Sequence, residues 1–117
     1  MLDSGALFTA AERSYVRTRP DPYASLAGLL SAKEACVKAL SSLGGAPDHT
    51  FPDIEVEHGP AGQPRIRPHG RLGRWARERR LAVELSISHT GDMAGAVVVL
   101  LSAPTEGPGR EEESESW

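Results

Sequence analysis

The chain has 117 residues, of which 39% are hydrophobic, 25% charged and only 5% aromatic. This length fits one small domain and excludes two ordinary ones, and a protomer so poor in aromatic residues is expected to oligomerise to bury enough apolar surface. The apolar run over 94–101 is too short for a membrane helix, and no basic region followed by an apolar stretch opens the sequence. A single cysteine, Cys36, excludes an internal disulfide framework and a multi-thiolate metal site. We therefore expect a cytoplasmic protein without a membrane segment.

Charge is distributed unevenly along the chain. The formal net charge is −3, but residues 103–117 contain five glutamates and one arginine, so they carry −4 and the remainder carries +1 (−3 minus −4). This segment is rich in proline, glycine and serine and lacks hydrophobic periodicity, which is typical of disorder. We predict a folded domain over 1–102 and an acidic disordered tail over 103–117.

The first half of the chain is predicted to be helical. Thr9 and Glu12, three residues apart, are typical of a capping box at the start of a helix, which the prolines within 19–22 end. Apolar residues then recur with helical spacing over 23–40, and a pair of glycines at 44–45 follows as a stop signal. Two helices are therefore expected before residue 45.

The second half is predicted to hold two hairpins separated by a helix. Apolar residues alternate with charged ones on both sides of a turn within 54–67, which indicates the first hairpin. Residues 70–80 show helical spacing among many arginines. Alternation over 83–88, a turn and the apolar run 94–101 indicate the second hairpin. The expected fold class is α+β, with a small antiparallel sheet packed against helices.

The lysines of this sequence are confined to one place. Eleven of the thirteen cationic residues are arginine, and the two lysines, Lys33 and Lys38, lie on either side of Glu34. At about 100° per residue, Glu34 and Lys38 share a helix face, whereas Lys33 projects into the apolar stripe. One interpretation is an exposed ion pair with Lys33 snorkelling out of the stripe, and the other is a functional cluster of charges.

A second polar group lies at the end of a predicted strand. Ser86 and Ser88 share one strand face and His89 follows at a turn, so hydroxyls, an imidazole and backbone N–H groups could converge on an anion. The simpler interpretation is a polar strand face that ends in a solvated histidine. The sequence Gly62-Gln63-Pro64, taken alone, indicates a turn and no more.

Taken together and in this order, these segments resemble the 4′-phosphopantetheinyl transferases. Residues 30–40 are similar to the Lys-Glu-Ala-x-x-Lys-Ala helix of that family, 62–64 to its Gly-Lys-Pro turn and 86–90 to its Ser-x-Ser-His strand. The short length and the sequence LFTAAE at 7–12 resemble the holo-acyl-carrier-protein synthase branch. The resemblance covers about residues 7–101.

The resemblance implies a phosphopantetheinyl transferase fold and a Mg²⁺-dependent transfer. The phosphopantetheine arm of coenzyme A would move to a serine of an acyl carrier protein, which releases adenosine 3′,5′-bisphosphate. It implies that Glu34 binds the metal and that Lys38 contacts the pyrophosphate and assists the leaving group. It also implies a homotrimer with sites between protomers, and His89, with Ser88 nearby, around the ribose 3′-phosphate. The positions that would contact coenzyme A are Lys33, Gly62, Pro64, Ser88 and His89.

One element of the family pattern is not found in this sequence. The family's Gly-x-Asp strand, whose aspartate is the other metal ligand, lies well before the motif at 7–12, and Asp3 is too close to Thr9 to take that place. Three alternatives stay open: a shortened form of the enzyme, a metal site completed differently, or a homologue that binds coenzyme A or a carrier protein without catalysis.

Seven arginines within 65–80 raise the further alternative of nucleic-acid binding. A net charge of +1 for residues 1–102, few aromatic residues for stacking and no nucleic-acid motif argue against it. We expect a solvated helix face or a docking surface for an acidic carrier protein instead.

Overall fold

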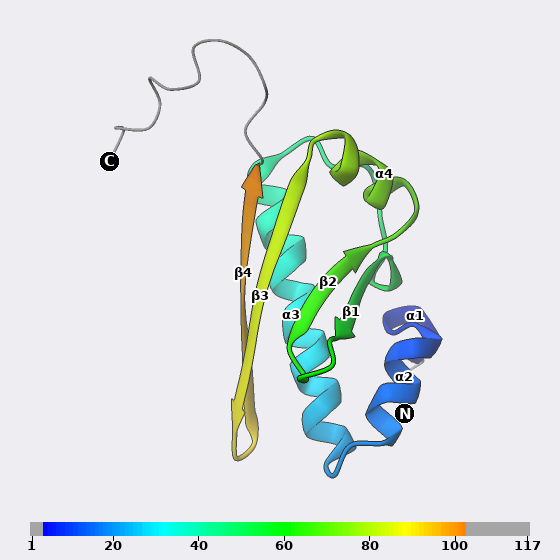
Figure 1. Ribbon diagram of the computed structural model, residues 1–117, viewed down its shortest axis with the longest axis vertical. Helices are drawn as coiled ribbons and strands as arrows, with labels where there is room; N and C mark the ends of the chain where they lie inside the picture. Colours follow the sequence, from blue (N-terminus) through cyan, green and yellow to red (C-terminus); the bar gives the residue numbers. More distant parts are fainter. Residues whose placement is uncertain (1–3, 103–117) are drawn as a thin grey trace, which may run out of the picture.

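The computed structural model describes residues 4–102 (Figure 1). Asp3 and the predicted tail over 103–117 lie outside the described residues, so the prediction of a disordered tail stays a prediction. No helix within residues 4–102 is both long enough and apolar enough to cross a membrane. The elements in chain order are α1 (Ser4–Leu7), α2 (Ala10–Arg17), α3 (Pro22–Leu43), the 3-10 helix η1 (Phe51–Asp53), β1 (Ile54–His58), β2 (Pro64–Pro68), α4 (Gly70–Glu78), β3 (Leu81–Thr90) and β4 (Met93–Ser102).

The predicted capping box at the start of α2 is confirmed. The Thr9 hydroxyl accepts from the backbone N–H of Glu12 at 3.1 Å, and the Glu12 carboxylate accepts from the backbone N–H of Thr9 at 2.8 Å. These two bonds satisfy donors that a helix start would otherwise leave free. The capping box fixes both side chains at one end of α2, where Glu12 also reaches the protein interior.

Helix α3 is longer than the sequence pattern predicted. It begins at Pro22, whose fixed φ suits the first helical position, after Asp21 caps the backbone N–H of Ala24 at 3.2 Å. It ends at Gly44, whose φ of 83° lies in a region that favours glycine. The helix therefore includes three residues beyond the predicted end at residue 40, since only the glycine stops it.

The α+β class and the two antiparallel hairpins are confirmed. In the first hairpin Ile54 pairs with Pro68, and in the second Leu81 pairs with Ser102. The hairpins form two separate two-stranded sheets within the described residues, because β2 and β3 contact each other without a shared ladder of backbone hydrogen bonds. Figure 1 shows α3 lying along the long β3–β4 hairpin, with β1 and β2 between that hairpin and α2.

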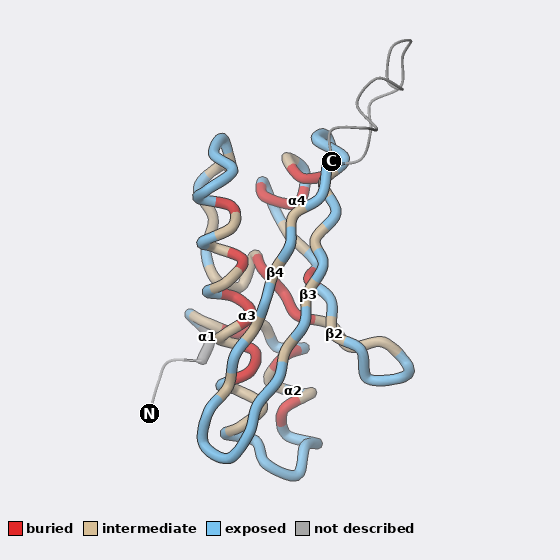
Figure 2. Tube along the Cα trace, turned by 90° about the vertical axis from the view of Figure 1, so that its left-hand side faces the viewer, coloured by how far each residue is buried: buried red, intermediate tan, exposed pale blue. Residues whose placement is uncertain are grey.

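The core lies where α3 meets the strands. One buried cluster joins α2, α3 and β1, and a second joins the C-terminal half of α3 to β1, β2 and α4. Figure 2 shows buried segments on the helices and on the short strands, whereas β3 and β4 alternate between half-buried and exposed positions. The outward face of β4 is apolar, with Met93 71% and Val97 63% exposed. Nothing within residues 4–102 covers this face.

Candidate functional site

A pocket of about 380 Å³ opens between α2, α3, the β1–β2 turn and β3. It brings together three of the predicted coenzyme A contacts, Gly62, Pro64 and His89, which come from two hairpins that are distant in sequence. The other residues that line it are Tyr15, Arg19, Pro20, Asp21, Ala24, Ser25, Gly28, Leu29, His58 and Ile87. The turn and the strand end that the sequence singled out therefore meet at one hollow.

Strand alternation and a glycine in α3 determine where His89 lies. A Cβ atom at Gly28 would lie 3.1 Å from Ile87 Cγ2 and 3.8 Å from His89 Cδ2, so α3 approaches β3 closely here. Ile87 and His89 therefore share the face toward α3, and the exposed Ser88 lies on the opposite face, outside the lining of the pocket. The structure separates two residues that the resemblance placed together at the 3′-phosphate.

Three side chains that sequence reasoning missed form another wall of the pocket. The rings of Tyr15 and His58 stack with centroids 3.8 Å apart and an interplanar angle of 6°, and the Arg19 guanidinium carbon lies 5.3 Å from the Tyr15 centroid. Burial lowers the pKa of His58, and nearby Arg19 lowers it further against the opposing effect of Glu12. A histidine directly before the hairpin turn was the one available signal in the sequence. This wall and His89 give the pocket a guanidinium and two imidazoles, which suit an anionic ligand.

Lys33 does not lie in this pocket. Its side chain is fully buried, and its ammonium group donates to the carbonyls of Phe51 and Ile54 at 2.9 and 2.7 Å and pairs with Glu12 Oε1 at 2.9 Å. The interpretation in which Lys33 snorkels to the surface is therefore wrong, because three oxygen atoms inside the protein accept hydrogen bonds from its ammonium group. All three ammonium hydrogens have acceptors, so none is left for a phosphate. The geometry gives Lys33 a structural role.

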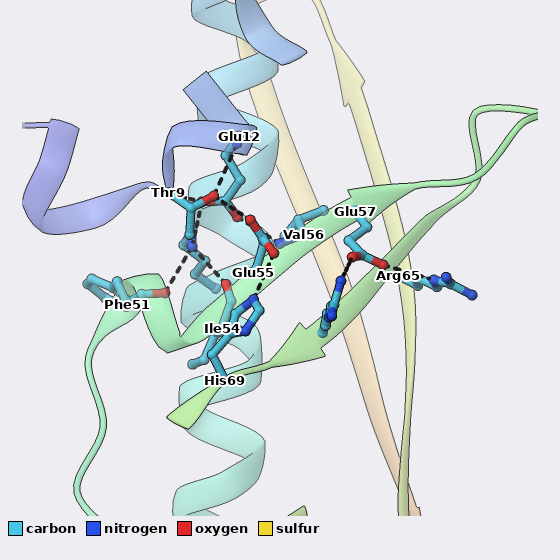
Figure 3. Close-up of polar contacts among 11 residues, drawn as sticks. Thr9, Glu12, Phe51, Ile54, Glu55, Val56, Glu57, Arg65 and His69 are labelled. Carbon is cyan, nitrogen blue, oxygen red and sulfur yellow. Dashed lines mark hydrogen bonds and ion pairs between the residues drawn. The ribbon is translucent and has the colours of Figure 1, made fainter. Parts of the chain in front are cut away.

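Lys33 belongs to a group that we call the interior cluster, which consists of Thr9, Glu12, Lys33, Glu55 and His69. Glu12 Oε2 also accepts from the backbone N–H of Val56 at 2.7 Å. Figure 3 shows Glu55 between Thr9, whose hydroxyl donates to it at 2.6 Å, and His69, whose Nε2 lies 2.7 Å from its other oxygen. The cluster thus connects α2, α3, η1, β1 and the N-cap of α4.

The pKa values of the interior cluster reflect competition between burial and pairing. Burial lowers the pKa of Lys33, and the Glu12 carboxylate opposes this by favouring the charged ammonium. Burial alone would raise the pKa of Glu55, but the hydrogen bonds from Thr9 and His69 outweigh it, and the pKa is lowered. The cluster therefore holds Glu55 in its ionised form.

Glu34 and Lys38 occupy a different face of α3. Both are exposed, and no ion pair within residues 4–102 includes either of them, so the exposed ion pair of the first interpretation is not formed. Glu34 is six residues beyond Gly28, which corresponds to about 9 Å along the axis and about 120° around it. One chain therefore does not bring these charges to the pocket. Among the described residues, no three His, Cys, Asp or Glu side chains are grouped to hold a metal ion.

Curated relatives resemble this chain over most of its length. A holo-[acyl-carrier-protein] synthase of Caldanaerobacter subterraneus is 36% identical over 94 residues, which cover 80% of this chain and 72% of the relative. The protein of the same name in Nocardia farcinica is 40% identical over 99 residues, which cover 80% and 67%.

Solved structures and a family model agree with these relatives. The acyl carrier protein synthase of Mycobacterium tuberculosis superimposes with a TM-score of 0.69 at 32% identity and covers 82% of this chain and 81% of its own. An ACPS–CoA complex of Chronobacterium ammoniagenes gives a TM-score of 0.73 at 31% identity over 87% and 82%. A model of the 4′-phosphopantetheinyl transferase superfamily matches residues 4–98. The chain therefore belongs to the 4′-phosphopantetheinyl transferase superfamily.

Proposed function

We propose that this protein is a holo-acyl-carrier-protein synthase. It transfers the 4′-phosphopantetheine arm of coenzyme A to a serine of an acyl carrier protein and releases adenosine 3′,5′-bisphosphate. The observation that carries the proposal is the pocket in which Gly62, Pro64 and His89, from two separate family motifs, lie together. Relatives named for this activity are 36 and 40% identical to the chain, which supports the same reaction here.

The pocket residues bind the anionic part of coenzyme A in this proposal. Arg19, on the α2–α3 connection, and His89, at the end of β3, both line the pocket, so they can donate hydrogen bonds to phosphate groups there. Gly62 has a φ of 85°, which glycine adopts without strain, and it lets the turn backbone form part of the wall. The pocket therefore supplies binding and orientation.

Glu34 and Lys38 supply the reactive end of the site. Mg²⁺ commonly keeps several waters and is held by one or two carboxylates together with substrate phosphates, so the single exposed carboxylate of Glu34 fits as one ligand. When bound, the metal neutralises charge on the pyrophosphate during attack by the carrier serine. Lys38 lies one helical turn beyond Glu34, where its ammonium can stabilise the departing phosphate oxygens.

The site is shared between protomers of a homotrimer. Glu34 and Lys38 lie on a face of α3 that the pocket of the same chain does not reach, so a neighbouring protomer must contribute one half. The exposed apolar face of β4, which includes Met93 and Val97, supports such an association. The buried thiol of Cys36, in a sequence without a second cysteine, supports a reducing cytoplasmic location.

The first test is transfer to a purified acyl carrier protein with Mg²⁺ and coenzyme A. Glu34→Gln keeps the side-chain shape and removes the ligand charge, so turnover should fall by at least about 100-fold. Glu78→Gln, an exposed glutamate on α4, is the matched control and should keep wild-type turnover. Wild-type turnover by Glu34→Gln would contradict the assignment. A wild-type chain that binds coenzyme A but transfers nothing would favour the alternative of a binding homologue without catalysis.

The second test addresses the shared site. Glu34→Gln and His89→Ala are each purified, then mixed in equal amounts and allowed to exchange subunits. If a site takes Glu34 from one protomer and His89 from its neighbour, about a quarter of the sites regain both groups, because each is present with a probability of one half. A site built within one chain would regain no activity. Light scattering should give the mass of three chains, and a monomeric mass would contradict the trimer.

A further inference from the structure

Arginine side chains without ion-pair partners gather at the α4 end of the molecule. Within residues 4–102, Arg65 and Arg67 pair with Glu57, but the remaining arginines of the stretch form no ion pair. The sole acidic residue of α4 is Glu78. We call these exposed, unpaired residues the arginine surface, and they are Arg71, Arg74, Arg77, Arg79 and Arg80.

The arginine surface contains a hollow. A cavity of about 260 Å³ lies between β2, α4 and β3, and it is lined by Arg67, Arg77 and Arg80 together with apolar residues that include Ile66 and Val83. Arg67 is paired with Glu57, but Arg77 and Arg80 form no ion pair within residues 4–102, so an anion in the hollow would offset the repulsion between their like charges. The hollow therefore offers two unpaired guanidinium groups, of Arg77 and Arg80, to carboxylate or phosphate groups.

Arg80 adopts a backbone conformation that its residue type disfavours. Its φ is 54°, and it directly follows the C-cap residue of α4, a position where helices usually place glycine or asparagine. A side chain with a Cβ atom is strained there.

An acidic segment of the same chain begins next to this surface. Ser102, the last residue of β4, pairs with Leu81, which directly follows Arg80, and Figure 1 shows the end of β4 and α4 at the same end of the molecule. Residues 103–117 carry a net charge of −4. At about 3.4 Å per extended residue, Glu111 reaches up to about 30 Å from Ser102, whereas α4 is about 14 Å long. The glutamates can therefore reach every arginine of the surface.

We propose that the acidic segment 103–117 binds the arginine surface of its own chain, with glutamate carboxylates in the hollow between Arg77 and Arg80. Arginine pairs with carboxylates through paired hydrogen bonds, and tethering raises the local concentration of the segment. The contact shields the arginine surface from other polyanions. Because exposed charge pairs are screened by salt, the segment is released at high ionic strength. This contact is independent of the transfer reaction.

A spin label on the segment tests the proposal in the full chain. Ser114→Cys provides an attachment point, and the native Cys36 stays unlabelled because it is buried and burial raises its pKa to about 11. In the ¹⁵N-labelled protein at low salt, the nitroxide should broaden the NMR signals of the backbone amides of residues 70–80. The broadening should disappear at about 1 M NaCl, where the Debye length is about 3 Å.

Two matched arginine variants decide whether the contact is specific. Arg77 and Arg17 are both exposed arginines in the last turn of a helix, so Arg77→Gln and Arg17→Gln remove the same charge from equivalent positions. Arg77→Gln should lower the ratio of bound to free segment by about two- to fivefold, as expected for one exposed pair, and Arg17→Gln should leave it unchanged. Arg80→Gly should weaken the contact while raising the thermal midpoint, because it relieves the backbone strain.

Several outcomes would overturn the proposal. One is an absence of broadening in residues 70–80 at low salt, and another is equal broadening in Arg77→Gln and Arg17→Gln. A third is broadening that arises only between ¹⁵N-labelled chains and separate spin-labelled chains, because the occupant would then be the segment of a second copy. Displacement of the label from the surface by a carrier protein or an oligonucleotide at low concentration would also show that the segment is not its preferred occupant.

Discussion

The interior cluster and the pocket are built from the same elements, α2, α3 and β1, but their polar side chains are paired with each other in the cluster and form no ion pair in the pocket. Inside, Lys33 meets three oxygen atoms, and both Glu12 and Glu55 are paired. In the pocket, Arg19, His58 and His89 form no ion pair with any residue of 4–102. Removing one partner of a buried pair leaves an uncompensated charge and destabilises the fold, whereas the Arg19 guanidinium and the imidazole groups of the pocket are available to a ligand.

Two adjacent residues of α3, Lys33 and Glu34, differ in burial and in what their side chains contact. Lys33 and Glu34 are neighbours in sequence, yet Lys33 is fully buried and Glu34 is exposed, because successive residues of a helix point about 100° apart. The lysine connects α3 to Glu12 and to the carbonyls at the start of β1. The glutamate faces outward, where substrate and a neighbouring protomer can reach it. The motif therefore combines an anchor for the helix with the exposed carboxylate that we propose binds the metal.

The largest expected effect comes from breaking the interior cluster. Lys33→Met should lower the free energy of unfolding by about 3–5 kcal/mol, because the buried Glu12 carboxylate loses its counter-charge. Lys38→Met, on the exposed face of the same helix, is the matched control and should change it by less than about 0.5 kcal/mol. Urea denaturation of both variants measures the difference. Equal stabilities would mean that the ion pair inside the fold contributes nothing.

A double variant sharpens this result. Glu12→Gln removes the negative charge that Lys33→Met leaves behind, so the double variant should lose less stability than the sum of the two single variants. An additive loss would show that the two side chains act independently, despite their 2.9 Å separation.

The next effect is expected in the pocket. Coenzyme A should bind more tightly than its 3′-dephospho form by about 10- to 100-fold, since a phosphate held by charge-assisted hydrogen bonds gains about 1.5–3 kcal/mol. His89→Ala should remove most of this preference while changing the free energy of unfolding far less than Lys33→Met does. Calorimetric titration of both ligands into both proteins measures the preference. Equal affinities in the wild-type protein would mean that His89 does not contact the 3′-phosphate.

The sequence could predict the parts of this molecule that depend on local patterns. The capping box at Thr9 and the two hairpins follow from short-range spacing, whereas only the family resemblance implied that the 62–64 turn and His89 serve one site. The role of Lys33 could not be predicted, because helical periodicity shows that it points inward but not that Glu12 and the Phe51 carbonyl lie there. The pairing of Tyr15 with His58 is missed for the same reason, since it joins distant segments with no pattern between them.

The smallest expected effects are in the pH dependence of stability, where the two regions should respond in different ranges. The pKa of His58 is lowered from its usual 6.5 by burial and by Arg19, so the unfolded chain binds this proton more tightly than the folded protein does. Its contribution to stability is therefore full above about pH 6.5 and falls as the pH drops toward the lowered pKa. The pKa of Glu55 is lowered from its usual 4.5, because hydrogen bonds from Thr9 and His69 outweigh burial. Its contribution is full above about pH 4.5 and is lost as the pH falls through the folded pKa.

Two substitutions separate these pH ranges. His58→Phe keeps an aromatic ring against Tyr15 and removes the titrating group, so the decline in urea midpoint just below pH 6.5 should become shallower. Glu55→Gln keeps the side-chain size and should flatten the curve only below about pH 4.5, because an amide does not titrate there. If the urea midpoint of His58→Phe fell with pH just below pH 6.5 as that of the wild type does, the pKa of His58 would be the same in the folded and unfolded states. The pocket would then be more open to water than its stacked wall indicates, and the contrast with the interior cluster would rest on ion pairing alone.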